Sequence, residues 1–208
     1  MSPAQVVLWR HGQTTWNAEG RWQGHTDVPL SELGEQQVRG AAAVLAERGP
    51  VRVVSSDLVR ASATAGALAL AADLPVALDP RLREVFGGDW QGLRRTEIES
   101  GWPELHAAWL AGEDVPPGGG ERRTAAGARV VAAVEEHAAP LADDEVLVVV
   151  GHGGALGAAL LQLLGLPREA APVLTGLRNA RWTSLLRGGT GPVPWRLLEH
   201  NAGAWSAA

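Results

Sequence analysis

The sequence predicts an α/β protein, a three-layer α/β/α sandwich around a mostly parallel sheet. Three apolar runs, at residues 6–9, 51–54 and 146–150, have the length and the β-branched content of buried strands. Helical patterns separate these runs, and strands that alternate with helices are typical of parallel sheets covered on both faces. Because the 208 residues contain no linker and no repeat, we expect one domain over residues 1–208.

Capping residues and glycines set the other expected elements. Ser31 is predicted to cap a helix that runs to about Arg48, and Asp57 to cap an Ala-rich helix that ends near Ala72. The remaining elements, in order, are a short strand at 74–78, an irregular segment at 81–92, helical stretches near 96–101 and 103–111, a break at 116–120, a helix over 124–137, an apolar helix from the turn at 151–154 to Leu164, and one or two closing strands at 182–186 and 195–198.

Composition excludes several classes of function. The net charge of −5 and the pI near 5.7 argue against a nucleic-acid partner, which normally binds a basic surface. No apolar run reaches membrane-spanning length and residues 1–10 lack the layout of a signal peptide, so we expect no membrane association and a cytoplasmic location. The chain has neither Cys nor Lys, which excludes thiol nucleophiles, the P-loop lysine and a Schiff base to a cofactor.

The histidines are not spaced as metal ligands are. None of the six forms a His-x-His pair or a His-Glu-x-x-His motif. We therefore predict that the chain works without a metal and without a cofactor. The six histidines are His11, His25, His106, His137, His152 and His200.

Charged side chains follow three of the predicted strands, at the point where each strand ends. Arg10 and His11 follow the first strand, Arg60 lies in the helix after the second, and His152 and Gly153 follow the strand at 146–150. The carboxyl ends of parallel strands share one edge of a sheet, and ligands bind there. Arginines and a helix N-terminus suit a phosphoryl group, whose transfer depends mainly on positioning and electrostatic stabilisation. The order of these residues predicts an anion site.

Five segments make the sequence similar to a known family, the histidine phosphatase superfamily, which includes the cofactor-dependent phosphoglycerate mutases. Its Arg-His-Gly signature resembles the segment around His11, and the other four segments follow in the family's order. The resemblance covers essentially the whole chain and implies a phosphoglycerate mutase-like fold. The matching segments are 8–17 (LWRHGQTTWN), 23–31 (QGHTDVPLS), 55–61 (SSDLVRA), 83–92 (REVFGGDWQG) and 150–154 (VGHGG).

The resemblance implies roles for five catalytic residues. His11 is the expected nucleophile, which becomes phosphorylated, while Arg10, Arg60 and His152 hold the transferring phosphate. Glu84 resembles the family's proton donor, which protonates the leaving oxygen and then activates water. Physical chemistry supports this role, because an alkoxide leaves poorly unless it is protonated.

Further residues in the matching segments are expected to bind substrate: Thr14, Asn17, Gln23, Gly24 and Gly153. For several other residues, the sequence leaves two interpretations open. His25 is either a substrate contact or a structural loop residue, and three tryptophans of the segments either pack or line the pocket. Four arginines near predicted helix ends either contact a second charge on the substrate or face solvent. These residues are Trp16, Trp22, Trp90, Arg94, Arg95, Arg122 and Arg123.

Within the superfamily, two features resemble the phosphatase branch. They are the length of the chain and the sequence at 88–92, in the loop that carries Glu84. Residues 119–121 and 176–183 further resemble bacterial phosphatases that act on glucosyl-3-phosphoglycerate, although Arg122 stands where a small hydroxyl residue is usual. We expect a phosphomonoesterase for a small phosphorylated metabolite, with a cap-like segment at about 90–120. A phosphoglycerate mutase and, less favoured, a noncatalytic phosphoester-binding module are the alternatives. Dimers are common in the family, so a homodimer is the candidate assembly.

Overall fold

The computed structural model describes residues 4–188 and 193–204 and contains one six-stranded sheet. The strand order is β3-β2-β4-β1-β5-β6, in which the first four strands are parallel and β5 and β6 pair antiparallel with their neighbours. The strands are β1 (Gln5–Arg10), β2 (Pro50–Ser55), β3 (Val76–Leu78), β4 (Val146–Gly151), β5 (Trp182–Arg187) and β6 (Trp195–Ala202).

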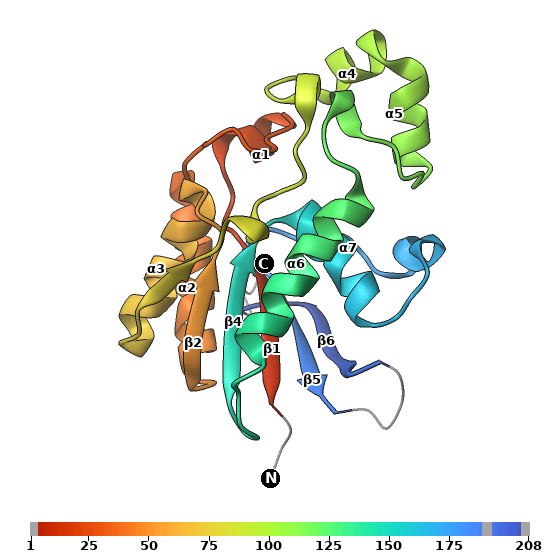
Figure 1. Cartoon of the computed structure of the whole chain (residues 1–208). Coiled ribbons are helices and arrows are strands. Elements are labelled where there is room, and N and C mark those ends of the chain that lie inside the picture. The colour runs from red at the N-terminus through yellow and green to blue at the C-terminus, as the bar shows by residue number, and fades with distance from the viewer. Residues whose placement is uncertain (1–3, 189–192, 205–208) are drawn as a thin grey trace.

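Two pairs of helices cover the two faces of this sheet (Figure 1). Helices α2 (Glu32–Ala46) and α3 (Val59–Ala72) pack together on one face, and α6 (Arg123–Ala138) and α7 (Gly153–Leu163) on the other. The three-layer sandwich with a mostly parallel sheet is therefore confirmed. The closing strands exist as expected and form the antiparallel side of the sheet.

Strand β4 shows why the sequence folds in this way. All six of its residues are buried, and successive side chains enter opposite layers. Leu147 and Val149 join the core below α6 and α7, whereas Val148 and Val150 join the core below α2 and α3. A run of apolar, β-branched residues satisfies both layers at once, so it forms a central strand and not one with a solvent face.

Short helices occupy the loops between these elements. Helices α1, α4 and α5 lie beyond the carboxyl ends of the parallel strands, so the chain rises above one edge of the sheet (Figure 1). The short elements are α1 (Thr15–Glu19), η1 (Pro80–Leu82), η2 (Gly88–Trp90), α4 (Arg95–Gly101), α5 (Pro103–Leu110), η3 (Pro117–Gly119) and η4 (Arg168–Val173).

One of the two predicted helix caps is confirmed and the other is wrong. The Ser31 hydroxyl accepts a hydrogen bond from the Gly34 N–H and caps α2, as expected. Asp57 does not cap α3, because its carboxylate pairs with Arg83 at 2.5 Å. The N–H of Val59 instead donates to Asp27 Oδ1 at 2.7 Å, from a loop 32 residues earlier. A side chain from a distant loop has taken over the capping.

In the described part of the chain, no helix combines the length and the apolarity that crossing a bilayer requires.

Asp79 is expected to contribute to stability above about pH 4. Hydrogen bonds from Arg81 lower its pKa from 3.8 to about 2, and the smaller effect of its burial opposes this. Because the folded-state pKa is depressed, the stabilisation is present above the unfolded-state pKa and is lost as the pH falls through about 2. Asp79→Asn should therefore lower the free energy of unfolding at pH 7 by about 2 kcal/mol.

The measurement is urea unfolding of both proteins at pH 7 and at several values between pH 4 and pH 2. The difference between them should shrink as the pH falls, because the wild-type carboxylate becomes protonated. A difference that stays constant over this range would mean that the charge of Asp79 does not stabilise the fold.

Candidate active site

Three strand ends and the irregular segment after η1 meet at one cavity of about 230 Å³. Arg10 and His11 come from the end of β1, Arg60 from the first turn of α3, and Gly154 from the start of α7. Glu84 enters from the irregular segment. The lining residues are Arg10, His11, Asn17, Arg21, Trp22, Gln23, Gly24, Arg60, Glu84, Val85, Trp109 and Gly154.

His11 presents a neutral imidazole with one ring nitrogen free. Its Nδ1 lies 2.7 Å from the carbonyl oxygen of Gly12, which can only accept, so Nδ1 carries the proton. Burial, followed by the positive charges of Arg10 and Arg60, holds the pKa of His11 well below 6.5. Nε2 therefore keeps its lone pair at neutral pH, which is the state that a nucleophile requires.

Gly12 allows the His11 loop to pack against helix α2. A Cβ at Gly12 would lie 2.6 Å from the carbonyl oxygen of Gly34, closer than real contacts permit. The Gly12 N–H donates to the hydroxyl of Thr64 at 3.2 Å. The glycine of the Arg-His-Gly segment is thus required by close backbone approach, and this packing fixes the position of the preceding imidazole.

Two guanidinium groups flank His11, that of Arg60, which is fully buried, and that of Arg10, which is partly buried. Arg60 is fully buried and donates to the carbonyl oxygens of Thr26 (2.8 Å) and Gly24 (2.7 Å). Burial lowers its pKa to about 10, so it stays charged at neutral pH. Arg10 donates through Nη1 to the carbonyl oxygen of Leu177 at 2.6 Å, and its Nε is buried with no acceptor.

Among the described residues, neither arginine forms an ion pair. A buried cation is costly unless a counter-charge reaches it. The two guanidinium groups and the free Nε of Arg10 therefore make a site for an anion that comes from outside the chain.

His152 is packed against both His11 and Arg60. The two imidazole rings lie 5.1 Å apart. Nδ1 of His152 accepts from Arg60 Nε at 3.2 Å, so its proton is on Nε2, which donates to the Ser56 hydroxyl at 3.0 Å. Burial, then Arg60, lowers the pKa of His152 well below 6.5. Both histidines of the site are therefore neutral at pH 7.

The carboxylate of Glu84 sits at the N-terminus of α7. It accepts from the N–H groups of Gly154 (3.1 Å) and Ala155 (2.8 Å), and from its neighbour Val85 (2.9 Å). A helix N-terminus favours negative charge, which explains why an acidic side chain rests there beside the cavity. The irregular segment thus delivers its carboxylate to the wall of the anion site.

The residues expected to bind substrate divide into two groups. Asn17, Gln23 and Gly24 line the cavity. Thr14 is fully buried, and its hydroxyl lies 3.1 Å from Asn17 Oδ1 and 3.0 Å from Gln23 Oε1, so its one proton can be donated to either of these two lining residues. Gly153 starts α7 beside Arg10: a Cβ there would lie 3.1 Å from the Arg10 Nε.

The structure places four of the residues for which the sequence left two interpretations open. His25 donates through Nε2 to the Glu84 carbonyl oxygen at 2.7 Å and has a structural contact in the loop. Trp22 lines the cavity, whereas Trp90 is fully buried in the core. The Arg123 guanidinium lies 3.4 Å from the centre of the Trp109 ring, at the edge of the site.

Three contributors are not among the residues that the sequence predicted for the site. The Asn179 amide donates to the carbonyl oxygens of His11 (3.2 Å) and Gly12 (3.3 Å) and to Asn17 Oδ1 (3.1 Å). The others are Trp109, which lines the cavity, and Arg129, which binds the backbone around Glu84. Each acts across more than forty residues of sequence or from within a helix, where neither spacing nor periodicity marks it.

No group of three or more His, Cys, Asp or Glu side chains that would suit a metal ion occurs within residues 4–188 and 193–204.

A sequence model described as the histidine phosphatase superfamily (branch 1) matches residues 6–202. The chain belongs to this superfamily. The resemblance seen in the five segments is confirmed, and so is the expected fold.

Individual relatives agree with this membership. The chain is 40% identical over 218 residues to a glucosyl-3-phosphoglycerate phosphatase of Mycolicibacterium vanbaalenii, covering 98% of this chain and 97% of the relative. It is 38% identical over 194 residues to a probable phosphoglycerate mutase of Yersinia pestis, covering 92% and 87%.

Among solved structures, a mycobacterial glucosyl-3-phosphoglycerate phosphatase in complex with VO3 superposes with a TM-score of 0.88 at 42% identity. The match covers 96% of this chain and 99% of that one. Superfamily membership and the phosphatase relatives make this chain an enzyme, a hydrolase of the phosphatase type, as its sequence led us to expect.

Proposed function

We propose that the chain hydrolyses the phosphomonoester of a small phosphorylated metabolite in two steps through a phosphohistidine on His11. The observation that carries the proposal is a neutral imidazole, with Nε2 free, between the guanidinium groups of Arg10 and Arg60, neither of which forms an ion pair among the described residues. A phosphate dianion supplies the missing counter-charge and brings phosphorus to the nucleophile.

In the first step, Glu84 starts as the carboxylic acid: His11 Nε2 attacks phosphorus, and the ester oxygen departs with the proton of Glu84, which is left as the carboxylate. Arg10 and Arg60 stabilise the charge on the phosphoryl oxygens, which is the main requirement of phosphoryl transfer. In the second step, the Glu84 carboxylate takes a proton from water, which attacks the phosphohistidine. Inorganic phosphate then leaves and the neutral imidazole is restored. The balance is one ester and one water consumed, one alcohol and one phosphate formed.

The substrate we propose is a phosphorylated sugar metabolite of the glucosyl-3-phosphoglycerate type. Two observations support it: relatives with that name match nearly the whole chain at 40–41% identity, and the cavity opens beside aromatic and cationic side chains. We propose that residues 1–208 are one domain in which about 90–120 forms a cap. Trp109, from α5 in this segment, lines the cavity, which supports this proposal.

The competing activity is phosphoglycerate mutase chemistry, which one of the relatives bears in its name. A panel of sugar phosphates, phosphoglycerates and glucosyl-3-phosphoglycerate separates the two when free phosphate and isomer exchange are both measured. We expect release of phosphate as the main reaction, unchanged by EDTA. Efficient isomer exchange with little free phosphate would overturn the proposal in favour of the mutase. No turnover of any ester would favour the noncatalytic module.

We also propose the cytoplasmic location and the homodimer that the sequence led us to expect. Sedimentation of the purified protein tests the second of them: a monomer at micromolar concentration would remove it.

A further inference from the structure

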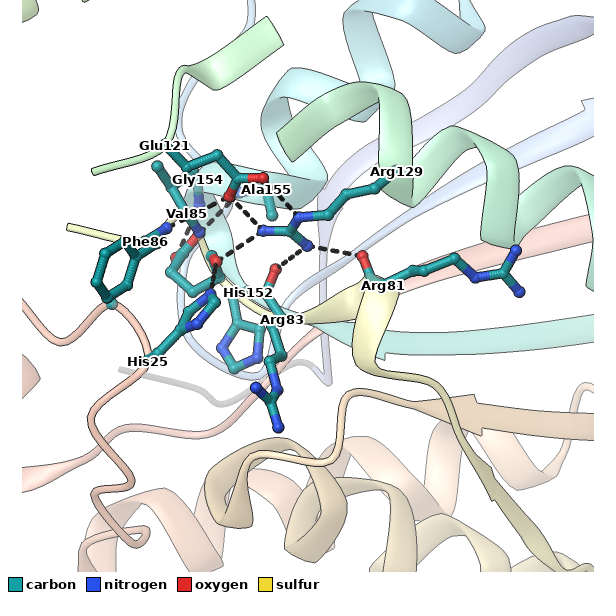
Figure 2. A network of polar contacts seen from close by, with 12 residues as sticks. His25, Arg81, Arg83, Val85, Phe86, Glu121, Arg129, His152, Gly154 and Ala155 are labelled. Atoms are coloured by element: carbon teal, nitrogen blue, oxygen red, sulfur yellow. Dashed lines mark hydrogen bonds and ion pairs between the residues drawn. The ribbon is translucent and has the colours of Figure 1, made fainter. Parts of the chain in front are cut away.

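A single side chain of helix α6 binds the backbone that carries Glu84. Arg129 donates through Nη1 to the carbonyl oxygens of Arg81 (2.7 Å) and Arg83 (2.6 Å), and through Nη2 to that of Glu84 (2.8 Å). Figure 2 shows the guanidinium facing the carbonyl oxygens of Arg81 and Arg83. The backbone at 84–87 has no regular secondary structure, so no strand or helix ladder fixes its carbonyl groups.

Glu121 completes the arrangement from the other side. Its carboxylate accepts from Arg129 Nε at 2.8 Å and Nη2 at 2.7 Å, and the Glu121 N–H donates to the Phe86 carbonyl oxygen at 2.8 Å. Burial is the largest single effect and raises the pKa of Glu121, but the hydrogen bond and the charge of Arg129, with the N–H of Phe86, together outweigh it, so the pKa is lowered. The pair holds the segment on both sides of Glu84, because Arg129 binds the carbonyl oxygens of Arg81 and Arg83 and Glu121 binds that of Phe86. Figure 2 shows the Glu121 carboxylate facing the Arg129 guanidinium.

This arrangement uses the geometry that is particular to arginine. Three carbonyl oxygens and two carboxylate oxygens surround one planar guanidinium, which has five N–H donors in a fixed fork. Lysine has three donors on one atom and cannot reach all of these acceptors. His25 adds a second hydrogen bond to the Glu84 carbonyl oxygen. The carbonyl of Glu84 is therefore fixed from two directions.

We propose that Arg129, held by Glu121, is the positioning residue for the general acid Glu84. The inference rests on the proposed function, in which Glu84 protonates the leaving oxygen. Once the carbonyl groups of 81, 83 and 84 are fixed, the direction of the Glu84 side chain is set, and its carboxylate reaches the N-terminus of α7 beside the cavity. A displacement of about 1 Å in such a group can cost roughly a hundredfold in rate.

The test is Arg129→Gln, followed by rapid mixing with an alkyl phosphate and with p-nitrophenyl phosphate. Phosphorylation of His11 by the alkyl ester should slow by roughly tenfold to a hundredfold, because its leaving oxygen needs the proton. Phosphorylation by the aryl ester should change by less than about threefold on the same argument. Inhibition by inorganic phosphate should be unchanged, since Arg10 and Arg60 make no hydrogen bond to Arg129.

A double variant separates positioning from general damage. In Glu84→Gln, the acid is already absent, so adding Arg129→Gln should not slow phosphorylation by the alkyl ester further. Losses that multiply in the double variant would overturn the proposal. Arg187→Gln is the matched control, since Arg187 also donates to two backbone carbonyl oxygens, of Leu141 and Ala138, outside the lining of the cavity. Arg187→Gln should leave the rate of His11 phosphorylation unchanged with both esters.

Glu121→Gln gives a milder second variant should Arg129→Gln unfold. It keeps the guanidinium but removes its charged partner, and it should show the same preference for the aryl ester with a smaller loss. Equal losses for both esters in the folded variants would overturn the positioning role. If Glu84→Gln itself shows no difference between the esters, the proposed function has failed instead, and the two failures are distinguishable.

Discussion

His11→Ala is expected to reduce turnover of every phosphoester by at least about a thousandfold. The variant removes the proposed nucleophile, a buried neutral imidazole beside the two guanidinium groups whose Nε2 is free to attack phosphorus. Binding of phosphate should persist, because His11 is neutral and its loss removes no positive charge. Arg10 and Arg60 remain.

The measurement uses a substrate labelled in the phosphoryl group. In the wild-type protein, alkaline quenching during turnover should leave label on His11, and acid quenching should release it, because a phosphoramidate is labile to acid. His11→Ala should carry no label, whereas the control His137→Gln, at the far end of α6, should be labelled normally. Turnover by His11→Ala at more than a trace, or label at another residue, would mean that the nucleophile is misassigned.

Glu84→Gln should slow phosphorylation of His11 by an alkyl phosphate by roughly a hundredfold or more. A sugar or glycerate oxygen leaves as a strongly basic alkoxide unless it is protonated. The phenolate of p-nitrophenyl phosphate leaves without a proton, so its phosphorylation step should be much less affected. The second step still lacks its base, and a burst of phenolate followed by slow turnover is expected.

The structure adds one consequence for this variant. The Glu84 carboxylate accepts from Gly154 N–H through one oxygen and from Ala155 and Val85 through the other. Glutamine keeps one of these oxygens, but its amide NH₂ would face another donor and lose a hydrogen bond. The lost hydrogen bond affects the variant in the same way with either ester. The ratio of the two phosphorylation rates therefore reports the loss of the proton donor and not this structural effect. Equal losses in the phosphorylation step would show that Glu84 is not the acid.

The order of strands and helices along the sequence was enough to predict much of the site. Because strand ends share one edge of a parallel sheet, the sequence alone placed Arg10, His11 and Arg60 near one another, and the structure brings them to one cavity. The same reasoning could not place Glu84, which lies in a segment with no periodicity. Only the resemblance to the superfamily pointed to it, and its geometry depends on a helix 45 residues later.

The error at Asp57 has the same physical origin. A capping preference is local, so an aspartate just before an Ala-rich helix is the expected cap. Two contacts from distant loops decide otherwise: Arg83 takes the Asp57 carboxylate, and Asp27 accepts from the helix. Asn179 was missed for the same reason, since its amide meets the His11 loop only after β5 has paired with β1. Polar contacts between residues that are distant in the sequence cannot be predicted from a short stretch of it.

The hydrogen bond from His11 Nδ1 to the Gly12 carbonyl oxygen has a consequence for the proton balance of the cycle. In the proposed mechanism, Nε2 forms its bond to phosphorus without first losing a proton, because the proton is fixed on Nδ1, and the phosphorylated ring becomes an imidazolium. The carbonyl dipole then faces a cation and stabilises it, while the positive ring remains a good leaving group for attack by water. The nucleophile therefore exchanges no proton with solvent in either step. Unlike a serine nucleophile, it needs no neighbouring base to activate it, and all the proton traffic of the reaction passes through one carboxylate.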